Sequence, residues 1–214
     1  MISITFSSCQ ESISTKKEFF KWVNNPGNGL IKKVTVGPLD YQVKYLPPEY
    51  LAFDEWEQEQ QDGNEVSLKE LINEYNKSLT FLFTITPNGT GGNIDIMKAG
   101  VNNYEEYTER VHEMNFNMAE YVSLKVDEVT YKPVLTRLEN IYGVGKYRNF
   151  HIVFAPTIED SVTIRNGEKF DFTYLDQFHE TGINHFTFNK KDIYELPKLE
   201  FINKNLTIAT NENN

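Results

Sequence analysis

The feature that most constrains this fold is a repeated alternation of apolar and polar residues. In residues 79–86, LTFLFTIT, the apolar side chains of Leu79, Phe81, Phe83 and Ile85 recur at every second position. Successive side chains of a strand point to opposite faces, so this period predicts strands with one face in a core. Further strands are predicted over 30–36, 41–46, 122–131, 135–142, 150–155, 161–165, 170–175 and 185–188.

Helical patterns are confined to the first 121 residues. Thr15 and Glu18 form a capping-box pattern before a short helix, and apolar residues at steps of three and four predict helices over 68–78 and 104–121. Asn166-Gly167 predicts a type I′ hairpin turn. The expected fold class is α+β, an antiparallel β-sheet or β-sandwich with two to three helices in the N-terminal half.

The chain has 214 residues and a single cysteine, so no internal disulfide is expected. We predict three parts: residues 1–14 as a signal remnant and tether, residues 15–202 as one globular α+β domain, and residues 203–214 as a disordered polar tail.

The lone cysteine, Cys9, follows a short apolar stretch and two serines. The run Phe6-Ser7-Ser8-Cys9 resembles the lipobox of bacterial lipoproteins, and the 17 lysines against 4 arginines resemble lipoproteins of the Bacteroidota. The resemblance is confined to this N-terminal segment. It implies a lipid on Cys9, a membrane anchor and a place in the bacterial cell envelope, facing the periplasm, with surface exposure as the alternative.

Charge narrows the choice of partner. The chain carries 31 acidic and 21 basic residues, a net charge of −10, which argues against nucleic acid as a partner. Residues 49–74 hold nine acids against one lysine and account for −8 of that total. This segment is either a solvated surface or a docking face for a basic protein. The residues predicted to contact such a partner are Asp54, Glu55, Glu57, Glu59 and Asp62.

The sequence offers few candidates for a metal-binding or catalytic site. His179, His185 and Asp176 are close in sequence, and two imidazoles with a carboxylate can form an open metal site. With Asp171 they are also the candidates for a hydrolytic site. The sequence has no G-x-S-x-G motif and no phosphate-binding glycine pattern, and no cofactor is expected.

Three functions remain open from the sequence. The favoured one is a membrane-tethered envelope lipoprotein that binds a basic protein through its acidic face without catalysis, as an immunity-like or accessory protein. The second is a periplasmic hydrolase or carbohydrate-binding module that uses the histidine–acid set. The third is a cytosolic β-rich domain.

Overall fold

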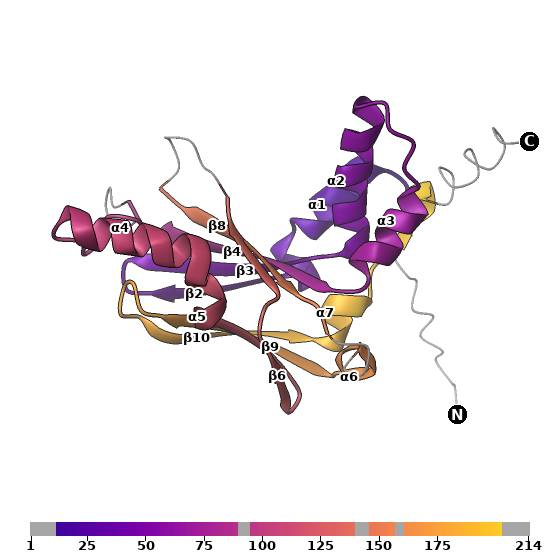
Figure 1. The fold of residues 1–214 in the computed structure, drawn as a ribbon. Coiled ribbons are helices and arrows are strands. Elements are labelled where there is room, and N and C mark those ends of the chain that lie inside the picture. Colours follow the sequence, from indigo (N-terminus) through magenta and orange to yellow (C-terminus); the bar gives the residue numbers. More distant parts are fainter. Residues whose placement is uncertain (1–11, 90–94, 140–145, 157–160, 203–214) are drawn as a thin grey trace, which may run out of the picture.

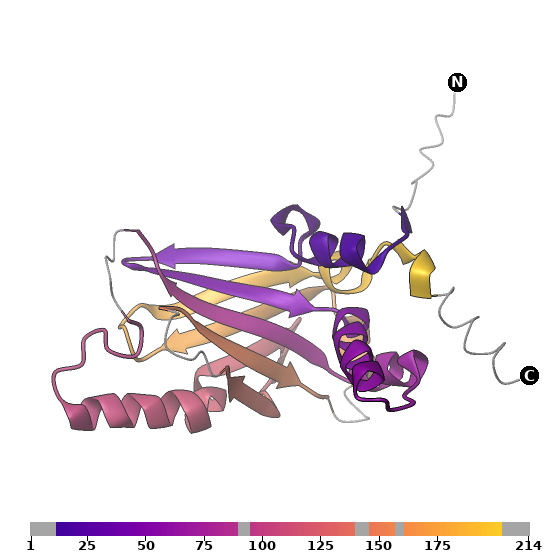
Figure 2. The ribbon, with the colours of Figure 1, turned by 90° about the horizontal axis from the view of Figure 1, so that it is seen from above.

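The computed structural model describes residues 12–89, 95–139, 146–156 and 161–202. Two antiparallel sheets pack face to face, and helices cover the ends of the resulting sandwich (Figures 1 and 2). The α+β fold class with antiparallel sheets is therefore confirmed. The described residues form seven α-helices. Three of these, α1 to α3, precede residue 76, and the others follow later in the chain.

The larger sheet has the order β2-β3-β4-β8-β7 and the smaller one the order β10-β9-β5-β6. Every pairing within these two sheets is antiparallel. The strands of the larger sheet are β2 (Ile31–Val36), β3 (Leu39–Leu46), β4 (Leu79–Pro87), β7 (Leu135–Leu138) and β8 (Arg148–Phe154). Those of the smaller sheet are β5 (Val122–Val126), β6 (Val129–Tyr131), β9 (Lys169–Asp176) and β10 (Gly182–Asn189).

Aromatic side chains fill the space between the two sheets. Phe81 and Phe83 of β4 are fully buried, and Phe83 lies 5.8 Å from Phe172 and 4.7 Å from Tyr174, measured between ring centroids. The inward-facing residues of β4 and β9 are the ones that the alternation predicted. Rings at these distances add a favourable edge-to-face or tilted contact to the burial of apolar area, so the core fixes how the two sheets are stacked.

Helices gather at one end of the sandwich. There α1, α2 and α3 form a lobe beside the larger sheet, and α6 and α7 lie under it (Figure 1). The lobe begins with the predicted capping box, in which the Thr15 hydroxyl accepts from the Glu18 backbone N–H. These helices are α1 (Lys16–Val23), α2 (Pro48–Gln61), α3 (Leu68–Tyr75), α6 (Ser161–Asn166) and α7 (Lys190–Tyr194).

The predicted long helix over 104–121 lies at the other end of the molecule. It is built from α4 (Tyr104–His112), a π-helical segment at Glu113–Asn117, and α5 (Met118–Tyr121). Met114 and Met118 of the predicted apolar stripe are fully buried, whereas Tyr104 at its start is 82% exposed. The stripe is therefore exposed at its start, partly buried at Tyr107 and Val111, and fully buried at Met114 and Met118.

Two strand predictions are wrong. Residues 161–166 form α6, and β9 begins after it, so Asn166-Gly167 does not connect two strands. A Cβ on Gly167 would lie 2.2 Å from a methyl carbon of Val126, so close packing requires this glycine. The predicted strand over 122–131 is two strands, β5 and β6, joined by a tight turn at Asp127, whose φ is +49°.

Both ends of the described chain meet at one place. Strand β1 (Ser12–Ile13) pairs in parallel with β11 (Lys198–Leu199), and Ile13 is buried. Ser12 and Ile13, which the sequence assigned to the tether, thus belong to the folded domain. The remainder of that segment, including Cys9, and the predicted tail over 203–214 lie outside the described residues.

Candidate functional site

The histidine–acid set predicted from the sequence is divided between two places. Asp171 of β9 pairs with His185 of β10 on the outer face of the smaller sheet, with 2.8 Å between Oδ2 and Nδ1. Asp176 and His179 lie at the end of β9, five residues or about 17 Å further along the strand, with Asp176 facing inward. Across the described ranges, no three His, Cys, Asp or Glu side chains are grouped to hold a metal ion.

Asp176 is the centre of a saturated hydrogen-bond network. Its carboxylate accepts from the hydroxyls of Tyr41, Tyr174 and Thr181 at 2.9, 3.1 and 2.7 Å, and from three backbone N–H groups of the following turn. Burial acts to raise the pKa of this carboxyl, but the His179 imidazole and the donating hydroxyls outweigh it and hold the pKa well below its usual range. Asp176 therefore fixes the β9–β10 turn.

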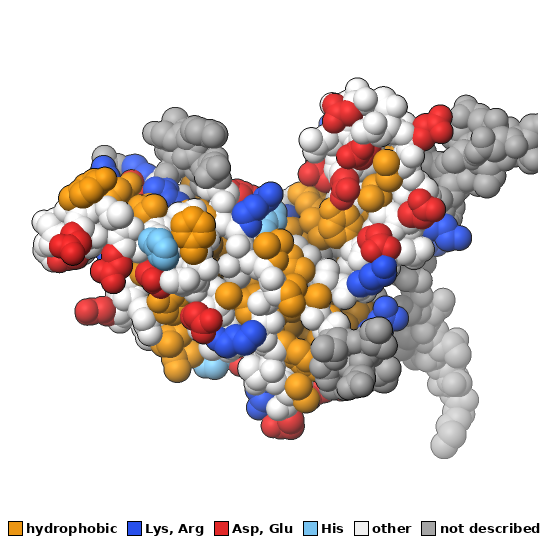
Figure 3. Space-filling model, in the orientation of Figure 1, with side chains coloured by type: hydrophobic (Ala, Val, Ile, Leu, Met, Phe, Trp, Pro, Cys, Tyr) orange, Lys and Arg blue, Asp and Glu red, His pale blue; other side chains and the backbone are white. Residues whose placement is uncertain are grey.

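The predicted acidic face lies on α2, in the lobe that stands out from the sandwich. Acidic side chains gather over this lobe in the space-filling view (Figure 3). Asp54 and Asp62 are exposed there. The other three predicted contact residues are partly buried.

These three partly buried carboxylates have partners within the chain. Glu55 accepts a hydrogen bond from the Tyr75 hydroxyl, and Glu57 pairs with Lys16. Glu59 accepts from a side-chain amide in the α2–α3 connection. The predicted face is therefore brought together on one helix, but part of its charge already serves the packing of α1, α2 and α3.

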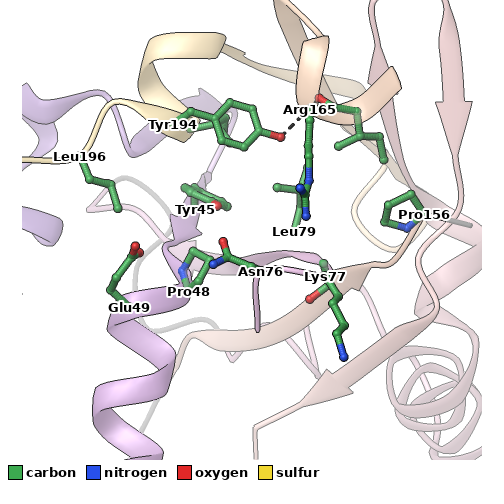
Figure 4. A pocket seen from close by; sticks show the side chains of 13 residues that line it. Tyr45, Pro48, Glu49, Asn76, Lys77, Leu79, Pro156, Arg165, Tyr194 and Leu196 are labelled. Atoms are coloured by element: carbon green, nitrogen blue, oxygen red, sulfur yellow. Dashed lines mark hydrogen bonds between the residues drawn. The ribbon is translucent and has the colours of Figure 1, made fainter. Parts of the chain in front are cut away.

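A concave site lies elsewhere, where the helical end meets the sandwich (Figure 4). It is a cavity of about 800 Å³, within the range of small-molecule sites. Five segments line it: the end of β3 with the start of α2, the α3–β4 connection, Pro156 after β8, α6, and α7 with Leu196 after it. Apolar side chains provide most of its walls.

Glu49 gives this cavity an uncommon polar group. It is the second residue of α2, directly after Pro48, and its Oε2 atom is buried with no hydrogen-bond partner among the described residues. Burial raises the pKa of this carboxyl, although a hydrogen bond with its own backbone acts to lower it. A buried polar atom without a partner destabilises a fold by about 1–3 kcal/mol, so its presence needs a reason.

Two phenols lie between the charged groups of the cavity. Tyr45 is almost fully buried, and burial, together with the negative fields of Tyr194 and Glu49, raises the pKa of its hydroxyl. Burial likewise raises the pKa of Tyr194, whereas the nearby Arg165 acts to lower it. The Tyr194 hydroxyl donates to the backbone carbonyl of Ile164 at 3.3 Å. Glu49 thus acts electrostatically on Tyr45, and Arg165 acts on Tyr194.

Two basic residues lie at the cavity wall. Arg165 of α6 extends into the cavity in Figure 4, and it forms no ion pair with another described residue. Lys77 differs, because its ammonium contacts both carboxylate oxygens of Glu74 at 2.6 and 2.7 Å. The guanidinium of Arg165 is the cation available to a bound molecule.

The sequence did not single out this cavity. Its lining residues come from positions 45 to 196, and no local spacing connects them. One feature of the sequence does mark Glu49. It is the first acidic residue of the segment 49–74 and directly follows Pro47-Pro48, and proline is favoured at the first position of a helix.

Comparisons with known proteins leave the function open. No family model and no curated protein matches this chain. A crystal structure of a novel protein of unknown function from Burkholderia pseudomallei K96243 is similar, with a TM-score of 0.37 and 9% sequence identity over 83% of this chain and 86% of that chain. A likeness of this size carries no argument about function. Within the described ranges, no helix is both long and apolar enough to cross a membrane.

Proposed function

We propose that this protein binds a small amphipathic molecule in the cavity between its helical end and the sandwich. The observation that carries the proposal is the buried, unpartnered carboxyl oxygen of Glu49 in a mostly apolar cavity of about 800 Å³. A bound molecule that supplied the missing donor would relieve the cost of burying that atom.

Binding without catalysis is the version we favour. The described lining contains a serine hydroxyl, Ser78, but no histidine, cysteine or aspartate. Glu49 is a group that general acid–base chemistry can use, but the Ser78 hydroxyl donates to the backbone carbonyl of Tyr75 at 3.4 Å and not to a base, so the described lining shows no activated nucleophile. The two histidine–acid pairs among the predicted residues lie on β9 and β10 or in the turn between these strands, and neither lines this cavity.

The test is to fill the cavity. Ser78→Trp places an indole where the α3–β4 connection lines it, and Gln58→Trp places the same side chain on an exposed part of α2. Binding of the dye anilinonaphthalene sulfonate, followed by its fluorescence, should saturate at one dye per chain in the wild type and in Gln58→Trp, and should be lost in Ser78→Trp. Equal dye binding by all three proteins would refute the proposal.

A second candidate function is docking of a basic protein on the α2–α3 lobe. The exposed Asp54 and Asp62 on a projecting helix favour it. Replacing both by Lys should abolish salt-sensitive binding to a basic partner protein, and an unchanged affinity would remove this candidate.

The place of action is a separate proposal. We propose a lipid on Cys9 that anchors the protein in the bacterial cell envelope, facing the periplasm, on the basis of the lipobox-like run alone. Incorporation of labelled palmitate that is lost in Cys9→Ala would support it, and no label in either protein would remove it.

A further inference from the structure

Two side chains of opposite charge line this cavity. Glu49 contributes a carboxyl group with an unpartnered oxygen, and Arg165 contributes a guanidinium that pairs with no other described residue. The influence of Glu49 on Tyr45, and of Arg165 on Tyr194, places one charged group near each phenol. The two charges thus face the same space from different elements, α2 and α6.

Much of the cavity wall is apolar. Leu79, Ile193 and Leu196 line it together with Pro48 and Pro156. Covering such a surface with the hydrocarbon part of a ligand is favourable, because it removes apolar area from water. A fully charged small ion such as acetate or ammonium would leave these walls uncovered.

Resting on the proposed function of this cavity, we propose further that its ligand is an elongated zwitterion. An ammonium group would lie against Glu49, an apolar body against Leu79 and Ile193, and an anionic group against Arg165. Each end then forms a charge-assisted hydrogen bond, with a buried oxygen at Glu49 and with an exposed guanidinium at Arg165. A short apolar peptide with free ends and an ω-amino acid share this chemistry.

Isothermal titration calorimetry with three probes of equal chain length tests the inference. The probes are ω-aminooctanoate, octylamine and octanoate. We expect the zwitterion to bind at least about tenfold more tightly than either singly charged probe, since one charge-assisted hydrogen bond changes a dissociation constant by about that factor or more. Equal affinities for the three probes would overturn the inference.

Two variants test which residue binds which end of the zwitterion. Glu49→Gln should weaken the zwitterion by about tenfold or more and leave octanoate unchanged, and Arg165→Gln should do the reverse, leaving octylamine unchanged. Glu49→Gln is nearly isosteric, and Arg165 is exposed, so both variants should retain the fold. A zwitterion affinity that neither variant changes would overturn the inference.

A second set of titrations distinguishes a short peptide from an ω-amino acid as the ligand. Trileucine with free ends is compared with its N-acetylated and its C-amidated forms. Tighter binding of free trileucine than of ω-aminooctanoate assigns a peptide, and the opposite order assigns an ω-amino acid. Failure of all zwitterions while Ser78→Trp still abolishes dye binding overturns the ligand class alone, whereas failure of dye binding as well overturns the proposed function.

Discussion

Each end of the sandwich has a carboxyl group with at least one buried oxygen, and the two carboxyl groups differ in their hydrogen-bond partners. Asp176, at the β9–β10 turn, accepts from three hydroxyls and three backbone N–H groups, and its pKa is lowered. Glu49, at the start of α2, leaves one oxygen without a partner, and burial raises its pKa. The first carboxyl stabilises the fold, whereas the second weakens it and is available for binding.

The largest expected effect is at the satisfied carboxyl. Asp176→Ala leaves several buried donors without an acceptor and should lower the free energy of unfolding by roughly 3–5 kcal/mol. Urea denaturation followed by circular dichroism measures it. Asp171→Ala, in the pair on the outer face of the same strand, is the matched control and should cost less than about 1 kcal/mol. Similar losses in both variants would show that Asp176 is not a structural centre.

The pH dependence of stability should have opposite signs at the two carboxyls. The pKa of Asp176 is lowered by folding, so its contribution is complete above about 3.9, the unfolded value, and is lost as the pH falls toward the folded-state pKa. The pKa of Glu49 is raised, so its cost is complete above the folded-state pKa and disappears as the pH falls to about 4.3, the unfolded value.

Unfolding at a series of pH values tests this contrast. The gap in unfolding free energy between wild type and Asp176→Asn should be full at neutral pH and close only in strong acid. The advantage of Glu49→Gln over wild type should instead be largest at neutral pH and vanish in mild acid. Gaps that close in the same pH window would contradict the assignment.

A smaller difference should separate two buried tyrosines of β3. The Tyr41 hydroxyl donates to Asp176, whereas that of Tyr45 forms no hydrogen bond with another described residue. Tyr41→Phe should cost about 1 kcal/mol and Tyr45→Phe close to nothing. Thermal denaturation compares them, and a larger cost for Tyr45→Phe would argue against this account.

One small expected change in stability has the opposite direction. Glu49→Gln removes a buried charge without a partner and should stabilise the ligand-free protein at neutral pH by roughly 0.5 kcal/mol. The same variant should bind the zwitterion more weakly, so stability and binding would change in opposite directions. A destabilised Glu49→Gln would mean that the carboxylate has a structural partner.

Much of the fold was readable from the sequence because alternation and helix caps are local. Residues 79–86 and 170–175 show the inward-facing rings directly, and Asn103 caps α4 through the Glu106 N–H at 2.9 Å. The prediction for 161–165 failed because a short β-branched run is compatible with either period. Its backbone is held as α6 by contacts outside the segment, including the bond from Tyr194.

The candidate site was not readable for a different reason. Each of its polar groups is unremarkable in its own segment, and only the packing of α2, α6 and α7 against the end of β3 brings them together. Conversely, Asp176 and His185 are neighbours in the sequence, yet the alternation of β9 and the turn after it place them on opposite sides of the smaller sheet. Closeness in the sequence therefore did not predict closeness in space for these residues.

The parallel pairing of β1 with β11 has a mechanical consequence. The chain enters β1 at one end of this two-residue ladder and leaves β11 at the other, so a pull applied between residues 12 and 202 would load the ladder in shear. Tension would be resisted there, and by the burial of Ile13, before it reached any strand of the sandwich. The aromatic core and the cavity beside it would keep their shape under a force that separates only β1 from β11.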